Sequence, residues 1–188
     1  MEFPSPTKTW HNASYPAISP SNTALSVKGK TIFITGGGAG IGLAIAYAFA
    51  AAGTSTVAIS GRTEKTLLSA KNGIESAHEG VTVLPFVADV TDQKAVDAAF
   101  ASGGKVDILV HIAGYLPRLV PISQSRLQDW WSGFETNAKG SFIVTQAFLR
   151  VAASDATLLE NDNRHGPLAS FASLFGLPGF KDCRTQVI

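Results

Sequence analysis

Residues 31–42 read Thr-Ile-Phe-Ile-Thr-Gly-Gly-Gly-Ala-Gly-Ile-Gly, a β-branched run followed at once by a glycine-rich turn. The run over 31–35 has the composition of a buried strand. Apolar residues then recur at helical spacing up to Ala52, and Gly53 is placed to end that helix. A strand, a glycine turn and a helix in this order are typical of a dinucleotide-binding turn.

The glycine turn supplies most of the candidate binding residues. Its glycines permit a tight bend and let the backbone approach a pyrophosphate, whose negative charge is favoured at a helix N-terminus. The alternative is a tight strand-to-helix turn that binds no ligand. On the first interpretation, the dinucleotide contacts in this segment are Thr35, Gly36, Gly40, Ile41 and Gly42.

Strands and helices alternate along the rest of the chain. Further strands are predicted over 56–60, 81–87, 106–111 and about 167–172. Helices are predicted over 63–69, from a cap at Thr91 to about 101, around Trp130 and Trp131, and over 140–151. Near-continuous apolar strands joined by helices indicate parallel strands that are covered on both sides. The expected fold class is α/β, a Rossmann-type doubly wound parallel sheet with helices on both faces.

The composition bounds the organisation of the chain and its partners. The 188 residues suffice for one domain with a core. Residues 1–28 hold four of the nine prolines, which predicts an extended or poorly ordered arm before a domain that starts at about 29. Fifteen basic against fourteen acidic residues give a net charge of +1, so neither nucleic acid nor an anionic membrane surface is an expected partner.

Two further features bear on the location of the protein and on metals. The single cysteine, Cys183, and a first segment without an apolar secretion signal favour a reducing setting, so we expect the protein in the cytoplasm. The apolar stretch 36–60 is broken by glycines and by 53–56 into pieces too short to span a membrane. The four histidines show no metal-ligand spacing with Cys183, and no metal is expected.

The spacing Thr-Gly-x-x-x-Gly-x-Gly resembles the short-chain dehydrogenase/reductase family, and later motifs follow in the family's order. Asp89-Val90-Thr91 resembles the family's acidic contact to adenine. Residues 111–114, His-Ile-Ala-Gly, resemble its Asn-Asn-Ala-Gly, with Ala113 and Gly114 matching literally. His111 stands where the family has asparagine, which leaves that backbone-bracing contact open. The resemblance covers about residues 28–180 and looks similar to members from filamentous fungi. It implies an NAD(P)-binding Rossmann domain over 29–180.

The family resemblance also implies catalytic residues and a cofactor preference. Asn137 resembles the family's helix-borne catalytic asparagine, and Ser173 its catalytic serine. A carboxylate at the end of the second strand would bind the ribose of NAD, whereas a cation there accommodates the phosphate of NADP. This chain has Gly61-Arg62 at that position, so NADP is expected ahead of NAD; a solvated surface arginine is the alternative.

The pattern departs from the family near its end. No Tyr-x-x-x-Lys, the family's general acid with its lysine, occurs in these 188 residues, and 181–188 do not resemble the family. We therefore expect a chain truncated before that pair, without the family's last strands, through a shifted frame, an unspliced intron or an early stop. Two hypotheses follow: an NADP-dependent oxidoreductase acting on a small carbonyl or alcohol with an incomplete catalytic tetrad, or a non-catalytic dinucleotide-binding protein. The family's homo-oligomer is doubtful for this chain.

Overall fold

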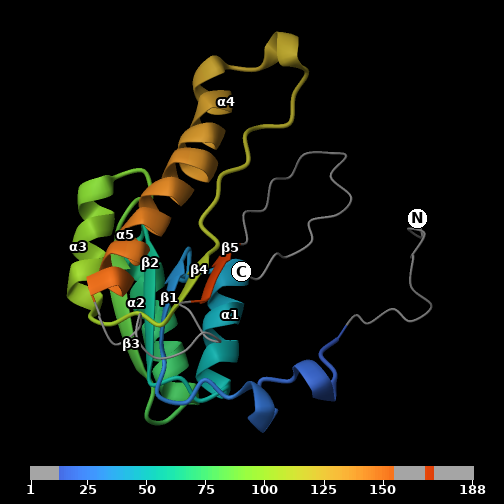
Figure 1. The fold of residues 1–188 in the computed structure, drawn as a ribbon. Coiled ribbons are helices and arrows are strands. Elements are labelled where there is room, and N and C mark those ends of the chain that lie inside the picture. Colours follow the sequence, from blue (N-terminus) through green and yellow to red (C-terminus); the bar gives the residue numbers. More distant parts are fainter. Residues whose placement is uncertain (1–12, 155–167, 172–188) are drawn as a thin grey trace.

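Five parallel strands form the centre of the molecule (Figure 1). The computed structural model describes residues 13–154 and 168–171. The strands are β1 (Thr31–Thr35), β2 (Thr56–Gly61), β3 (Thr82–Val87), β4 (Ile108–His111) and β5 (Leu168–Phe171). Their order across the sheet is β3-β2-β1-β4-β5, so successive strands are added on one side of β1 up to β3 and on its other side from β4. All five predicted strands are confirmed within two residues at each end, and so is the parallel α/β class.

Helices cover both faces of this sheet. They are α1 (Gly40–Ala51), α2 (Glu64–Ala77), α3 (Gln93–Gly103), α4 (Leu127–Phe134) and α5 (Ser141–Ser154), with a π-helical turn (Glu135–Gly140) between α4 and α5. Side chains alternate along β1, because Ile32 and Ile34 face α1 and α2 while Phe33 faces α3 and α5. The ring of Phe33 stacks on that of Phe100 in α3 at a centroid distance of 4.2 Å.

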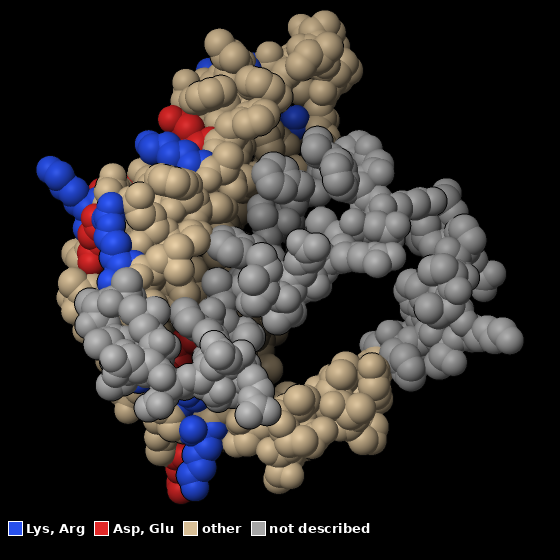
Figure 2. Space-filling view, viewed as in Figure 1, with Lys and Arg blue, Asp and Glu red and all other residues tan. Residues whose placement is uncertain are grey.

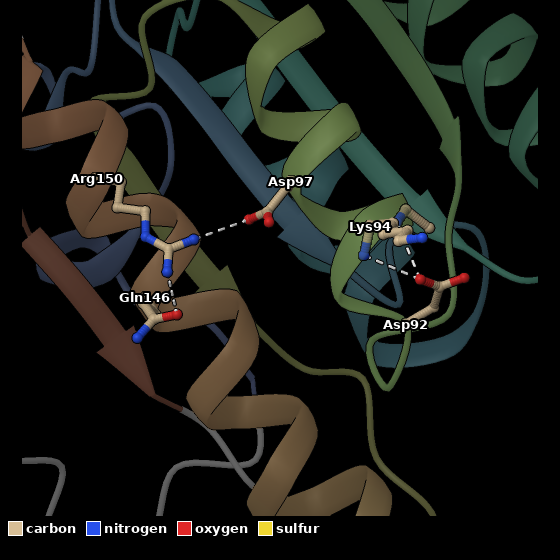
Figure 3. Close-up of polar contacts among 6 residues, drawn as sticks. Asp92, Lys94, Asp97, Gln146 and Arg150 are labelled. Atoms are coloured by element: carbon tan, nitrogen blue, oxygen red, sulfur yellow. Dashed lines mark hydrogen bonds and ion pairs between the residues drawn. The ribbon is translucent and has the colours of Figure 1, made fainter.

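Two helix predictions need correction. Helix α2 runs to Ala77 rather than ending at Ser69, because Ala70 and Ile74 continue its buried stripe against the sheet. Helix α3 is capped by Asp92 rather than Thr91. The Asp92 carboxylate accepts hydrogen bonds from the backbone N–H groups of residues 94 and 95 at 3.0 and 3.2 Å (Figure 3).

An exposed ion pair joins α3 to α5 on the outer surface. Arg150 lies 3.5 Å from Asp97 and also donates to Gln146, one turn earlier on its own helix (Figure 3). Both charged side chains are about half exposed, so the pair adds little to the packing of the two helices.

Residues 116–134, which we call the α4 projection, extend beyond the end of the sheet (Figure 1). The chain runs outward through a short 3-10 turn (Ile122–Gln124) and returns as α4, which continues into α5. Its surface in the space-filling view is largely uncharged (Figure 2). Apolar side chains are exposed along it: Leu119, Ile122, Leu127, Trp130, Trp131 and Phe134.

The described part of the N-terminal segment lies against the start of the domain. Two short 3-10 turns, Pro16–Ile18 and Thr23–Leu25, carry no buried side chain. The backbone N–H of Val27 donates to the carbonyl of Ala52 at 3.2 Å, which ties this segment to the end of α1. The boundary between arm and domain stays a prediction.

Candidate functional site

A cavity of about 340 Å³ lies at the carboxyl ends of the strands, where the strand order reverses between β1 and β4. In doubly wound sheets this crevice is where nucleotides bind, because the loops after the two strands run in opposite directions and leave space. The lining residues are Gly36, Ala39, Ile41, Gly42, Ser60, Gly61, Arg62, Ala88, Asp89, Val90, Ile112, Ala113, Gly114, Tyr115 and Thr136.

Most of the predicted cofactor contacts meet in this cavity. Gly36, Ile41 and Gly42 come from the β1–α1 turn, Arg62 and Asp89 follow β2 and β3, and Ala113 and Gly114 follow β4. Thr35 and Gly40 belong to the same turn but do not line the cavity. Ser173 lies outside the described residues.

The β1–α1 turn has a geometry that only glycine fits. Gly36 has a φ of +72°, and a Cβ there would lie 3.1 Å from the backbone nitrogen of Ala113. A Cβ on Gly42 would overlap the carbonyl oxygen of Gly36, so the first turn of α1 packs directly on the loop before it. Because these neighbours are backbone atoms, they cannot move aside cheaply. The glycine spacing thus fixes a backbone surface at the N-terminus of α1.

Thr35 lies behind the cavity wall and joins the two turns that form it. Its hydroxyl oxygen accepts hydrogen bonds from the backbone N–H groups of Ile112 and Ala113 at 3.1 and 3.2 Å. The same oxygen is 2.7 Å from Nδ1 of His111. Both Thr35 and His111 are 1% exposed, and burial lowers the pKa of His111 to about 4. In this structure the Thr35 hydroxyl holds the backbone of the turn 112–114, and the imidazole of His111 contacts that hydroxyl.

Asp89 and Arg62 give the cavity its charged groups. One carboxylate oxygen of Asp89 accepts bonds from the backbone and the hydroxyl of Thr91, at 2.9 and 2.8 Å. Burial raises the pKa of Asp89, but these two bonds and the nearby Arg62 charge outweigh it, so its pKa lies below the ordinary value. Asp89 is therefore an anion at neutral pH, and Arg62 beside it is exposed.

Asn137 lies on the π-helical turn and is 8% exposed. Its side-chain oxygen accepts from the backbone N–H of Tyr115 at 2.9 Å, and its amide donates to the carbonyl of the same residue at 2.8 Å. Both ends of the amide are thus engaged by one residue of the cavity wall. In this structure the Asn137 side chain holds the chain segment that follows Gly114.

Tyr115 is a lining residue that the sequence analysis did not single out. Its hydroxyl donates to Asp129 of α4, and this bond, which stabilises the protonated phenol, raises its pKa. The other oxygen of Asp129 accepts from the backbone N–H of Arg118 at 3.0 Å. The position directly after the Ala113-Gly114 motif was the available signal. Asp129 therefore links the cavity wall to the α4 projection.

Neither a metal site nor a membrane-spanning helix is found in the part of the chain that the structure describes. Among residues 13–154 and 168–171, no group of three or more histidine, cysteine or acidic side chains is arranged to hold a metal ion. No helix within those ranges has both the length and the apolar character needed to cross a membrane.

Comparison with known proteins decides the family. The profile of the family described as short chain dehydrogenase matches residues 30–176. The chain belongs to the short chain dehydrogenase family. Among its relatives, the short chain dehydrogenase pigC of Monascus ruber is 38% identical over 150 residues, which are 76% of this chain and 49% of that protein. This relative supports the expected likeness to members from filamentous fungi.

Solved structures of two dehydrogenases share the fold. A short-chain type dehydrogenase/reductase from Mycobacterium ulcerans is 31% identical, with a TM-score of 0.63, over 69% of this chain and 49% of that one. An NAD+-bound xylitol dehydrogenase is 30% identical, also with a TM-score of 0.63, over 68% of this chain and 49% of that one. The chain spans about half the length of the curated relatives it matches.

Proposed function

We propose that the cavity binds NADP(H) and that the protein is an oxidoreductase which transfers hydride between NADP(H) and a small carbonyl compound or secondary alcohol. One observation carries the proposal: the glycine turn at the N-terminus of α1 and the Arg62–Asp89 pair line the same cavity. Membership of the short chain dehydrogenase family, whose members use NAD(P), supports it.

The lining residues fit the parts of a dinucleotide. The Gly36 and Gly42 backbone leaves room for a pyrophosphate at the positive end of the α1 dipole. Ile41 is 56% exposed at that helix start and offers an apolar contact. The ionised Asp89 carboxylate is an acceptor for the amino group of adenine. Ala113 and Gly114, which carry little or no side chain, complete the opposite wall.

The choice of NADP over NAD rests on the end of β2. The residues there are Ser60, Gly61 and Arg62, so no carboxylate is available to accept hydrogen bonds from the ribose hydroxyls of NAD. The guanidinium of Arg62 suits a phosphate, which it can bind through two parallel hydrogen bonds.

An Arg62→Ala variant tests this choice. We expect it to weaken NADPH binding by about tenfold or more while leaving NADH binding within about twofold, because a charged hydrogen bond contributes roughly 1.5–3 kcal/mol. Cofactor fluorescence would follow both titrations. Arg126, which lies outside this cavity, provides a matched control as Arg126→Ala. Equal losses for NADPH and NADH in the Arg62 variant would contradict the NADP preference.

The hydride chemistry sets what the rest of the site must do. Bound NADPH would supply the hydride, and the alkoxide formed from a carbonyl must then gain a proton. A phenol donates that proton near neutral pH only when a cation lowers its pKa. Tyr115 does not meet this requirement, because its bond to Asp129 raises its pKa. We propose that Ser173 and Asn137 are catalytic residues of this chain.

A second function, dinucleotide binding without turnover, is favoured by one observation. The residues four places after the three tyrosines, Tyr15, Tyr47 and Tyr115, are serine, alanine and leucine, so these 188 residues hold no Tyr-x-x-x-Lys. The loss of a general acid alone reduces a rate by about 10² to 10⁴. An assay of NADPH oxidation with a panel of ketones separates the two functions: turnover by the purified chain excludes the second, and saturable binding without oxidation excludes the first for this chain.

A further inference from the structure

The buried pair Thr35 and His111 holds together the two turns that line the cavity. The two residues are partners in the register of β1 and β4, so their side chains lie on the same face of the sheet. Each sits at the end of its strand, directly before a cavity-lining turn: Gly36 follows Thr35, and the turn 112–114 follows His111. Any change in how these side chains bond is therefore passed to both walls.

Counting donors and acceptors assigns the proton of the imidazole. A hydroxyl has one proton and two lone pairs. Both lone pairs of the Thr35 oxygen accept from backbone N–H groups, those of Ile112 and Ala113. The hydroxyl proton is then left for Nδ1 of His111, 2.7 Å away, which must be the unprotonated nitrogen of a neutral ring. The ring proton consequently lies on Nε2.

Within the described residues, the other ring nitrogen, Nε2, makes no such hydrogen bond. Among the residues that the structure describes, Nε2 of His111 is the buried side-chain nitrogen left without a hydrogen-bond partner. The bond to Thr35 is thus the polar contact that orients the imidazole within the described part of the chain. An unpartnered N–H is costly in a buried site. The bond at Nδ1 is the contact that keeps the imidazole in this orientation.

We propose that His111 is a positioning residue for the dinucleotide cavity: a neutral imidazole protonated on Nε2 accepts the Thr35 hydroxyl proton and so keeps both lone pairs of that hydroxyl on the turn 112–114. Without this acceptor, the Thr35 hydroxyl must donate its proton to another group. The rotation that this requires competes with the two bonds that its oxygen accepts from Ile112 and Ala113. The glycine turn and the turn 112–114 would then lose their fixed spacing. The inference rests on the proposed binding of a dinucleotide between these turns.

Nitrogen-15 NMR of the full chain, free of dinucleotide, tests the bond directly. We expect His111 to show an unprotonated Nδ1 and a protonated Nε2, and we expect the Thr35→Val variant to remove the shift that the hydrogen bond gives Nδ1. A protonated Nδ1 in the unmodified protein overturns the proposal. This measurement needs no bound cofactor and no variant of His111, so it decides even where a variant fails to fold.

Binding of NADPH tests the consequence. The side-chain oxygen of His111→Asn can replace Nδ1 as the acceptor, whereas His111→Phe keeps a ring of similar size without one. We expect His111→Phe to weaken NADPH binding about tenfold and His111→Asn by less than about threefold. Thr35→Val should weaken NADPH binding at least as much as His111→Phe, because it also removes the oxygen that accepts the bonds from Ile112 and Ala113.

The outcomes of the two measurements separate the inference from the proposed function. If the unmodified chain binds neither NADPH nor NADH, the proposed function fails, and the NMR signature still decides the state of the Thr35–His111 pair. If the unmodified chain binds NADPH and His111→Phe binds it equally well, with thermal melts showing that both are folded, the positioning role is contradicted while the proposed function stands.

Discussion

The cavity wall and the α4 projection are neighbours in the fold, but different interactions hold them in place. Behind the wall, the polar side chains of Thr35, His111 and Asn137 are at most 8% exposed. Thr35 and Asn137 bond to backbone groups of the adjoining turns, and His111 contacts the Thr35 hydroxyl. In the projection, Leu119 and Ile122 are 79% and 82% exposed. The side chain of Asp129 ties the outgoing chain to α4 through Tyr115 and Arg118.

This difference explains why the sequence of the wall is informative about function and that of the projection is not. The wall depends on backbone shape, and backbone shape at tight turns is determined by glycines whose spacing can be read directly. The projection depends on which surface its aromatic side chains contact, and their spacing in the sequence carries no such information. We therefore expect a rigid wall and a loosely held projection.

Gly42→Val should have the largest effect. Its Cβ would overlap the carbonyl oxygen of Gly36, which is a backbone atom of the tight turn after β1 and cannot move aside cheaply. We expect a loss of about 2–4 kcal/mol in the free energy of unfolding and no measurable NADPH binding. Urea denaturation and a fluorescence titration would measure the two effects.

Gly40→Ala is the matched control in the same turn. Gly40 has a φ of +55° but open space around it, so the variant meets only backbone strain, of about 1 kcal/mol. A loss as large as that of the Gly42 variant would show that the turn as a whole, rather than the close approach at Gly42, is what tolerates no side chain.

The stability of the wall should depend on pH through His111. Burial lowers its pKa from 6.5 to about 4 in the folded chain, so between these values the unfolded chain binds a proton that the folded chain does not. The free energy of unfolding therefore falls as the pH falls through this window, by up to about 1.4 kcal/mol per pH unit. His111→Asn should remove that part of the slope. Parallel curves for the two proteins in urea denaturation at about pH 5 and about pH 7 would refute the prediction.

Asp129→Asn should loosen the projection without affecting the wall. The variant weakens the bonds from the Tyr115 hydroxyl and the Arg118 backbone, while the bonds between Asn137 and the Tyr115 backbone remain. We expect faster hydrogen exchange over 116–126, a lowered pKa of the Tyr115 phenol, and unchanged NADPH affinity. Exchange measured by mass spectrometry would detect the first effect, and a matching increase over 31–42 would contradict the separation of the two regions.

Arg150→Ala should have the smallest effect. Its ion pair with Asp97 is about half exposed, and such pairs contribute roughly 0–1 kcal/mol. We expect a change below about 0.5 kcal/mol in urea denaturation, and a smaller one still in high salt. A loss above about 1.5 kcal/mol would mean that the contact between α3 and α5 depends on this pair rather than on its buried aromatic and aliphatic side chains.

The sequence was most informative where local pattern decides local structure. The strand at 31–35 and the tight turn after it are recovered because β-branched alternation and glycine spacing act over a few residues. Four cavity-lining segments follow the first four strands, so their convergence could be predicted from the parallel topology alone. The cap of α3 was misplaced by one residue because Thr91 and Asp92 are both good caps, and only the contact of Thr91 with Asp89 distinguishes them.

Other features depend on contacts between distant parts of the chain. That Asn137 would bond both backbone groups of Tyr115, 22 residues earlier, cannot be read from either position alone. The protonation of His111 depends on how many donors surround the Thr35 hydroxyl, 76 residues away. The catalytic role of Ser173 and the location of the protein in the cytoplasm stay predictions.

Titration of the purified full chain with NADPH and with NADH, followed by cofactor fluorescence, tests the central claim most directly. We expect saturable binding of NADPH, weaker binding of NADH, and loss of both in Gly42→Val. Failure of the unmodified, folded chain to bind either cofactor, or equal binding by the unmodified chain and Gly42→Val, would contradict the assignment of the cavity between β1 and β4 as a dinucleotide site.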